Sequence, residues 1–151
     1  MSTNSTLHIT ATLDNLATIR RFVTDTAADL GVNQTMISRL ELAVDEVATN
    51  IICHGYREQS GTIEIELSRQ GETLAIYVRD QAPSFDPTAV SPPDLTQSLH
   101  TREPGGLGIY ITKQVMDTVT HRLLPQGGNE LILVKQRIFS GTSLRDEDVA
   151  T

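Results

Sequence analysis

The fold of this chain is decided by residues 62–80, which read TIEIELSRQGETLAIYVRD. Apolar and polar residues alternate over residues 63–67 and again over 74–78, which is the period of half-buried strands. Between them, residues 69–72 (Arg-Gln-Gly-Glu) have the composition of a turn. The stretch therefore predicts an antiparallel hairpin with one face covered by other elements and one face open.

The chain before this hairpin predicts one strand and two helices. Apolar residues alternate over residues 6–11, which is typical of a short strand. Apolar positions three and four residues apart over residues 16–30 predict a first helix, with Asp14 as its N-cap and Gly31 as its stop. The same spacing over residues 34–53 predicts a longer helix with one continuous apolar stripe.

The chain after the hairpin predicts a long connection, a third helix and two more strands. Residues 81–104 contain five of the six prolines and no sustained periodicity, which indicates a functional loop or lid. A glycine cluster opens the third helix, predicted over residues 105–117. Residues 119–124 and 131–137 alternate as strands and are joined by a turn at 126–129.

This order of elements favours an α/β two-layer sandwich. In it, one mixed, mainly antiparallel sheet is covered on one face by three helices, and the other face is wet or meets a partner. A length of 151 residues supports one domain. We assign that domain to residues 1–140 and expect an acidic tail over 141–151.

Charge and composition narrow the classes of function. The chain has 12 Lys and Arg against 19 Asp and Glu, and its net charge of −7 repels a phosphate backbone. Three Tyr, three Phe and no Trp also argue against a stacking platform for single-stranded nucleic acid. We therefore expect no nucleic-acid partner, and any anionic ligand must be held by local groups such as a helix N-terminus or a metal ion.

The single cysteine, Cys53, excludes an intramolecular disulfide framework. Because Cys53 lies in an apolar stretch, we expect a buried, reduced thiol. Residues 1–10 show no signal-peptide pattern, and no run approaches the roughly 18 apolar residues of a membrane span. The sequence thus favours a cytoplasmic protein without a membrane segment.

Three groups of residues are candidates for a ligand site. Glu46 and Asn50 lie four residues apart on the second helix, away from its apolar stripe, and His54 extends the same row. Asp80 has the parity of the apolar residues of its strand, so its carboxylate is expected to face the helices. The glycine cluster lets the backbone approach a phosphate and exposes N–H groups at a helix start; it comprises Gly105, Gly106, Leu107 and Gly108. Taken singly, these patterns also fit a solvated helix face, a turn aspartate and a flexible hinge.

Taken together, three segments resemble the N, G1 and G2 boxes of the histidine-kinase-like ATPase superfamily. They are ELAVDEVATNIICHGY (41–56), VRDQAPSFDP (78–87) and GGLGIYITKQVMD (105–117). Within the superfamily they are most similar to the anti-sigma regulatory factors, the serine/threonine protein kinases of bacterial partner-switching systems. The resemblance covers nearly the whole chain and implies the Bergerat ATP-binding fold, with ATP and Mg²⁺ as cofactors.

The resemblance also implies a role for each box. Glu46 is then the base that orients the attacking hydroxyl or water, Asn50 the Mg²⁺ ligand, and Asp80 the acceptor for the exocyclic amine of adenine. The glycine cluster would hold the phosphates under a lid formed by about residues 87–103. Arg102, near the end of that lid, is a candidate contact for the γ-phosphate.

One position departs from the family pattern. The G1 box usually reads Asp-x-Gly, and Ala82 stands in place of its glycine. An alanine fits there if the backbone keeps a negative φ, and it crowds the adenine otherwise.

The expected function is an ATP- and Mg²⁺-dependent serine/threonine protein kinase. It would phosphorylate an antagonist protein and sequester a sigma factor. Ala82 keeps open an alternative, a sequestering module of the same fold with weak or no nucleotide binding. A sensor histidine kinase domain fits less well, because His8 lies in a predicted strand rather than on a dimerisation helix. A homodimer through the open sheet face or an edge strand is expected by resemblance, and Arg20 with Arg21 is a candidate docking pair for an acidic partner.

Overall fold

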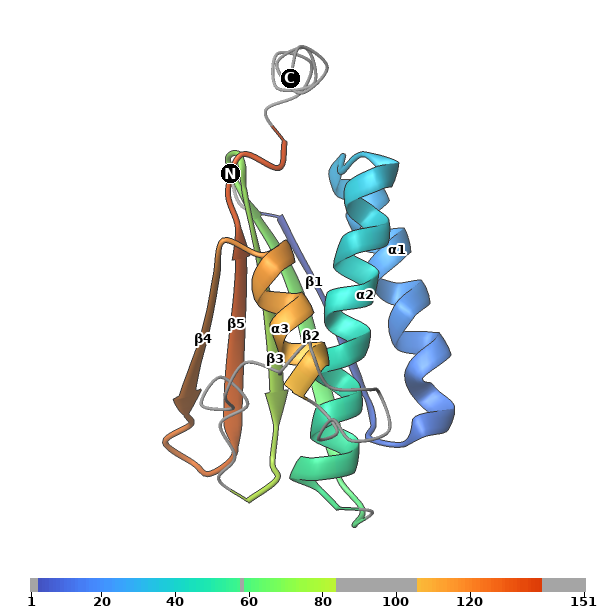
Figure 1. The fold of residues 1–151 in the computed structure, drawn as a ribbon, viewed down its shortest axis with the longest axis vertical. Coiled ribbons are helices and arrows are strands. Elements are labelled where there is room, and N and C mark those ends of the chain that lie inside the picture. The colour runs from blue at the N-terminus through green and yellow to red at the C-terminus, as the bar shows by residue number, and fades with distance from the viewer. Residues whose placement is uncertain (1–2, 58, 84–105, 140–151) are drawn as a thin grey trace, which may run out of the picture.

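The computed structural model describes residues 3–57, 59–83 and 106–139, and it confirms the two-layer α/β sandwich (Figure 1). The strands are β1 (Thr3–Thr10), β2 (Thr62–Gln70), β3 (Thr73–Asp80), β4 (Thr118–Leu123) and β5 (Asn129–Lys135). The helices are α1 (Leu16–Leu30), α2 (Gln34–Asn50) and α3 (Gly106–Val115). The predicted lid with Arg102, the first glycine Gly105 and the predicted tail over 141–151 lie outside the described residues.

The five strands form one sheet in the order β1-β2-β3-β5-β4. Every pairing among the described strands is antiparallel, so the expectation of a mixed sheet is wrong. The reason is the position of β5. It pairs antiparallel with both β3 and β4, so these two run parallel without being hydrogen-bonded neighbours.

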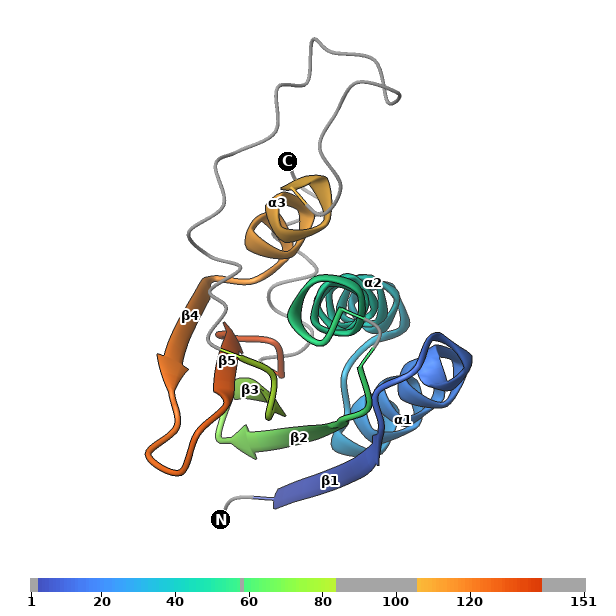
Figure 2. The same ribbon diagram turned by 90° about the horizontal axis from the view of Figure 1, so that it is seen from below.

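All three helices cover the same face of the sheet (Figure 2). The predicted apolar stripes are the buried ones: Ile19, Val23, Ala27 and Leu30 on α1, and Ile37, Leu40, Val44, Val47 and Ile51 along α2 and the turn that follows it. They pack with the inward residues of the hairpin, which are Ile63, Ile65, Leu67, Leu74, Ile76 and Val78. Each such aliphatic side chain stabilises the fold by about 1.5–3 kcal/mol through burial.

The helix ends differ in part from the predictions. Gly31 ends α1 with φ +102°, as expected for a left-handed C-cap. Asp14 is not the N-cap, because it lies inside a short 3₁₀ turn (Leu13–Asn15) and Asn15 takes the cap position. The Asn15 side chain donates its hydrogen bond to Thr10 O at 2.8 Å, which ties the start of α1 to the end of β1.

The second helix continues beyond Asn50 as a π-helical turn (Ile51–Gly55). The prediction of a buried Cys53 is wrong, because Cys53 continues the row of Glu46 and Thr49 rather than the apolar stripe. Ile51 and Ile52 take the buried positions, and Cys53 is exposed. Cys53 lines a cavity of about 350 Å³ between this turn and the connection from β1 to α1. None of the described helices is long and apolar enough to cross a membrane.

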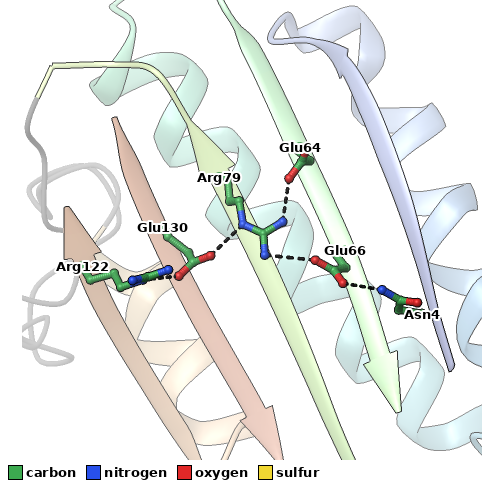
Figure 3. A network of polar contacts seen from close by, with 6 residues as sticks. All are labelled: Asn4, Glu64, Glu66, Arg79, Arg122 and Glu130. Carbon is green, nitrogen blue, oxygen red and sulfur yellow. Dashed lines mark hydrogen bonds and ion pairs between the residues drawn. The ribbon is translucent and has the colours of Figure 1, made fainter. Parts of the chain in front are cut away.

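The open face of the sheet carries a polar network centred on Arg79 (Figure 3). The Arg79 guanidinium donates to Glu64 and Glu130 at 2.6 Å each and lies 3.0 Å from Glu66. Arg122 also pairs with Glu130, whose side chain is only 3% exposed. Because these residues come from four neighbouring strands, the network fixes the register of the sheet across β2, β3, β5 and β4.

The network sets the ionisation of its carboxyl groups. A hydrogen bond from Asn4, followed by that from Arg79, lowers the pKa of Glu66 below its ordinary value of 4.5. Burial alone would raise the pKa of Glu130, but the hydrogen bonds from Arg122 and Arg79 outweigh burial and lower it. Both groups therefore contribute stability that is complete above about pH 4.5 and is lost as the pH falls through their lower folded-state values.

We expect Arg79→Met to lower the free energy of unfolding at pH 7 by about 2–3 kcal/mol, because it removes charged hydrogen bonds and leaves carboxylates poorly paired. Its stability should also fall less than that of the wild type as the pH is lowered below about 4.5, since the carboxyl pKa values return toward normal. Denaturant titrations at several pH values measure both effects. Arg21→Met on the exposed side of α1 is the control, and the same pH dependence in both variants would contradict the account.

Candidate functional site

Asp80, the last residue of β3, has its carboxylate buried, and the residue is 5% exposed. Oδ1 accepts hydrogen bonds from Ala82 N and from Asn129 Nδ2, both at 2.9 Å. Oδ2 accepts none from any residue that the structure describes. Burial raises the pKa of Asp80, and the hydrogen bonds from Asn129 and Ala82 oppose that shift. Within the described part of the chain, one oxygen of this buried carboxylate thus has no donor.

Asn129 is the site residue that the sequence did not reveal. It begins β5 directly opposite Asp80, whereas the sequence placed it in a turn. Its Nδ2 also lies 3.2 Å from Ala82 O, and its Oδ1 lies 3.0 Å from His121 Nε2. Only the register of β3 against β5 brings these groups together, and no local pattern in the sequence encodes that register.

Ala82 keeps the negative φ that an alanine needs at this position of the G1 box. It is 3% exposed and belongs to the hydrophobic core. The described non-glycine residues with a positive φ are Arg57 and Arg137, so Ala82 does not adopt the conformation that would require glycine. Its N–H and its carbonyl are both bound to the Asp80–Asn129 pair.

Glu46 and Asn50 lie one turn apart on α2, as predicted, but Asn50 is more buried than a solvated helix face allows. Asn50 is 5% exposed, and its carboxamide forms no hydrogen bond within the described part of the chain. Leaving such a group unsatisfied costs about 1–3 kcal/mol, so its position calls for a partner other than the residues that the structure describes. An amide oxygen is also an acceptable ligand for Mg²⁺.

Glu46 is half-buried in the same row. Burial, and then the neighbouring carboxylate of Asp45, raises the pKa of Glu46. Arg20 on α1 partly neutralises Asp45 through an ion pair of 2.8 Å. Arg20 is thus engaged with α2 within the fold, and His54 lies half-buried in the π-helical turn one step beyond Asn50.

The end of β3, the last turns of α2 and the first turn of α3 lie at the same end of the molecule (Figure 1). Gly106 begins α3, and Leu107 and Gly108 complete its first turn. The helix is fixed against α2 by buried Thr112, whose hydroxyl donates to Ala43 O at 3.3 Å. The described members of the three groups singled out from the sequence therefore lie on segments at one end of the sandwich.

The model of the family described as "Histidine kinase-like ATPase domain" matches residues 9–135 of this chain. The chain belongs to the histidine kinase-like ATPase domain family. The match begins near the end of β1, at residue 9, and runs to the last residue of β5, so it includes the other four strands and all three helices that the structure describes.

Comparisons with curated proteins and with solved structures agree with this assignment. The chain is 28% identical over 133 residues to proteins named serine-protein kinase RsbW from Bacillus cereus (strain Q1) and Bacillus anthracis (strain A0248). The alignments cover 85% of this chain and 82% of each relative. The crystal structure of the RsbU and RsbW domains of a Mycobacterium tuberculosis protein superimposes with a TM-score of 0.61 and 18% identity. That match covers 87% of this chain and 32% of the larger one, and it shows the fold.

Gly128 provides a test of how closely the two strands must approach at this site. It has φ +95°, and a Cβ atom there would lie 2.2 Å from Asp80 O. Neighbouring Gly127 has φ +98°, and a Cβ atom there would meet open space.

We expect Gly127→Ala to lower the free energy of unfolding by about 1–2 kcal/mol, from backbone conformation alone. Gly128→Ala should cost clearly more, because it also pushes against the backbone of Asp80.

Denaturant unfolding of the two variants side by side measures the difference. Equal destabilisation would mean that the contact between the turn and Asp80 does not constrain the site.

Proposed function

We propose that this protein is a cytoplasmic ATP- and Mg²⁺-dependent serine/threonine protein kinase that phosphorylates an antagonist protein and sequesters a sigma factor. The observation that carries the proposal is a pair of buried groups at one end of the sandwich that form no hydrogen bond with the described residues, Oδ2 of Asp80 and the carboxamide of Asn50. Membership of an ATPase domain family and similarity to serine-protein kinases named RsbW support it.

The free oxygen of Asp80 suits the adenine base. An ionised carboxylate accepts a hydrogen bond and donates none, so it attracts the exocyclic amine of adenine. Guanine places a carbonyl oxygen at the equivalent ring position, which would face the carboxylate acceptor to acceptor. The proposed site therefore prefers ATP to GTP, and the buried surroundings strengthen that preference.

The phosphates are proposed to lie between Asn50 and the first turn of α3. The main-chain N–H groups of Gly106, Leu107 and Gly108 open that helix and favour negative charge. Asn50 would hold Mg²⁺, which neutralises phosphate oxygens when bound and takes its remaining ligands from phosphate and water. Gly105, Arg102 and His54 are proposed further contacts. These local groups would overcome the repulsion from a chain of net charge −7.

Glu46 is the proposed catalytic base. The hydroxyl oxygen of the substrate serine or threonine attacks the γ-phosphorus, the bond to the β–γ bridging oxygen breaks, and Glu46 takes the hydroxyl proton. The raised pKa of Glu46 favours this role, because a carboxylate whose pKa is nearer to neutral holds the proton better.

The alternative remains a sequestering module of the same fold, and Ala82 in the G1 turn is the residue that favours it. Such a module captures its partner equally with and without Mg·ATP. A kinase exchanges partners when ATP is added. A homodimer through the open sheet face or the β1 edge stays a prediction for either function.

The roles of Asp80 and Glu46 can be separated by experiment. We expect Asp80→Asn to weaken Mg·ATP binding about 10- to 100-fold in calorimetry, the equivalent of one charged hydrogen bond. Glu46→Gln should bind Mg·ATP within about twofold of the wild type but reduce phosphate transfer from radiolabelled ATP to a candidate antagonist by at least about 100-fold.

Glu41→Gln on the same helix is the matched control, because Glu41 pairs with Thr24 of α1. Undiminished transfer by Glu46→Gln would reject the proposed base. A wild-type protein that binds no Mg·ATP would favour the sequestering module.

A further inference from the structure

Tyr56, which follows the π-helical turn at the end of α2, places its hydroxyl between two strands. The residue is 5% exposed. Its Oη donates to Thr62 O at 2.6 Å and accepts hydrogen bonds from Gln81 N at 2.7 Å and Thr62 N at 3.3 Å. The single donor of the phenol and both of its acceptor positions are used.

These contacts extend the hairpin by one step. The last paired residues of β2 and β3 at this end are Ile63 and Asp80, and the next two opposite residues would be Thr62 and Gln81. The phenol oxygen of Tyr56 contacts the backbone of both and stands in for the direct bond between them. The residue directly after Asp80 is therefore held by the end of α2 as well as by its own strand.

Packing fixes the hydroxyl in this position. A Cβ atom on Gly61 would lie 2.1 Å from the Tyr56 ring, so the ring packs directly on the backbone there. The Tyr56 N–H also donates to Ile51 O at 2.8 Å, which completes the last turn of the helix. The ring cannot slide, and its hydroxyl is a fixed anchor point.

We propose that Tyr56 is a positioning residue that holds the turn after Asp80 in the geometry needed to recognise the base of the nucleotide. This inference rests on the proposed function. Asn129 holds the same turn from β5 through Ala82 O, and Tyr56 holds it from α2 through Gln81 N. Because Tyr56 follows Asn50 on one continuous helical segment, it sets the distance between the base-binding and metal-binding groups.

Tyr56→Phe removes the hydroxyl and keeps the ring. Gln81 N–H then loses its acceptor, and we expect its amide hydrogen to exchange at least about tenfold faster in the protein without nucleotide. We expect affinity for Mg·ATP to fall about five- to tenfold, the equivalent of one hydrogen bond, with a smaller preference for ATP over GTP. A purely structural residue would leave that preference unchanged.

Tyr77→Phe is the matched control, because the Tyr77 hydroxyl forms no hydrogen bond within the described residues. It should change neither amide exchange at Gln81 nor the preference for ATP. The wild type gives a second measurement that needs no variant, since the Gln81 amide should be protected although its side chain is exposed.

The outcomes are distinct. Wild-type binding of Mg·ATP with unchanged affinity and base preference in Tyr56→Phe would overturn the role of Tyr56 alone, and so would an unprotected Gln81 amide. A wild type that binds no Mg·ATP would overturn the proposed function, and this role of Tyr56 with it.

Discussion

The site depends on one constraint, which is the need to satisfy a carboxylate buried at the end of a central strand. An unpaired buried charge is far too costly to keep, so Asp80 requires donors within the fold. Asn129 and the N–H of Ala82 supply them to one oxygen. Gly128 lets the opposite turn come close enough, since any side chain there would collide with the backbone of Asp80. What remains is one buried carboxylate oxygen that accepts no hydrogen bond from the described residues.

An ion pair on the open face of the sheet stabilises the pairing of β3 with β5 at the same position. Arg79 precedes Asp80 and Glu130 follows Asn129, and the pair of charged residues lies opposite each other just as the polar pair does. The ion network on the open face therefore resists a slip of β3 against β5, which would separate Asp80 from its partner. The ion network on one face and the contact between Asp80 and Asn129 on the other depend on one register.

Periodicity was sufficient to predict the elements, and parity was sufficient to place Asp80 on the covered face. Helical spacing also put Glu46 and Asn50 in one row, but the burial of Asn50 comes from tertiary packing that spacing does not contain. Asn129 was missed for a similar reason, since its contact with Asp80 spans 49 positions along the chain. The predicted burial of Cys53 is wrong because apolar neighbours along the chain do not fix the face that a residue occupies, and Cys53 lies on the side of Thr49, away from the core. The prediction that Gly31 ends the first helix is confirmed, because the left-handed conformation at a helix end is a local requirement that favours glycine.

Under the proposed function, Oδ2 of Asp80, which has no donor among the described residues, accepts a hydrogen bond from the exocyclic amine of adenine. The most direct measurement is calorimetric binding of ATP and of N6,N6-dimethyl-ATP, which has no hydrogen on that nitrogen, both with Mg²⁺. We expect the dimethyl compound to bind at least about tenfold more weakly than ATP to the wild type, and Asp80→Asn to reduce this difference in affinity. Equal affinity of the wild type for the two nucleotides would contradict it.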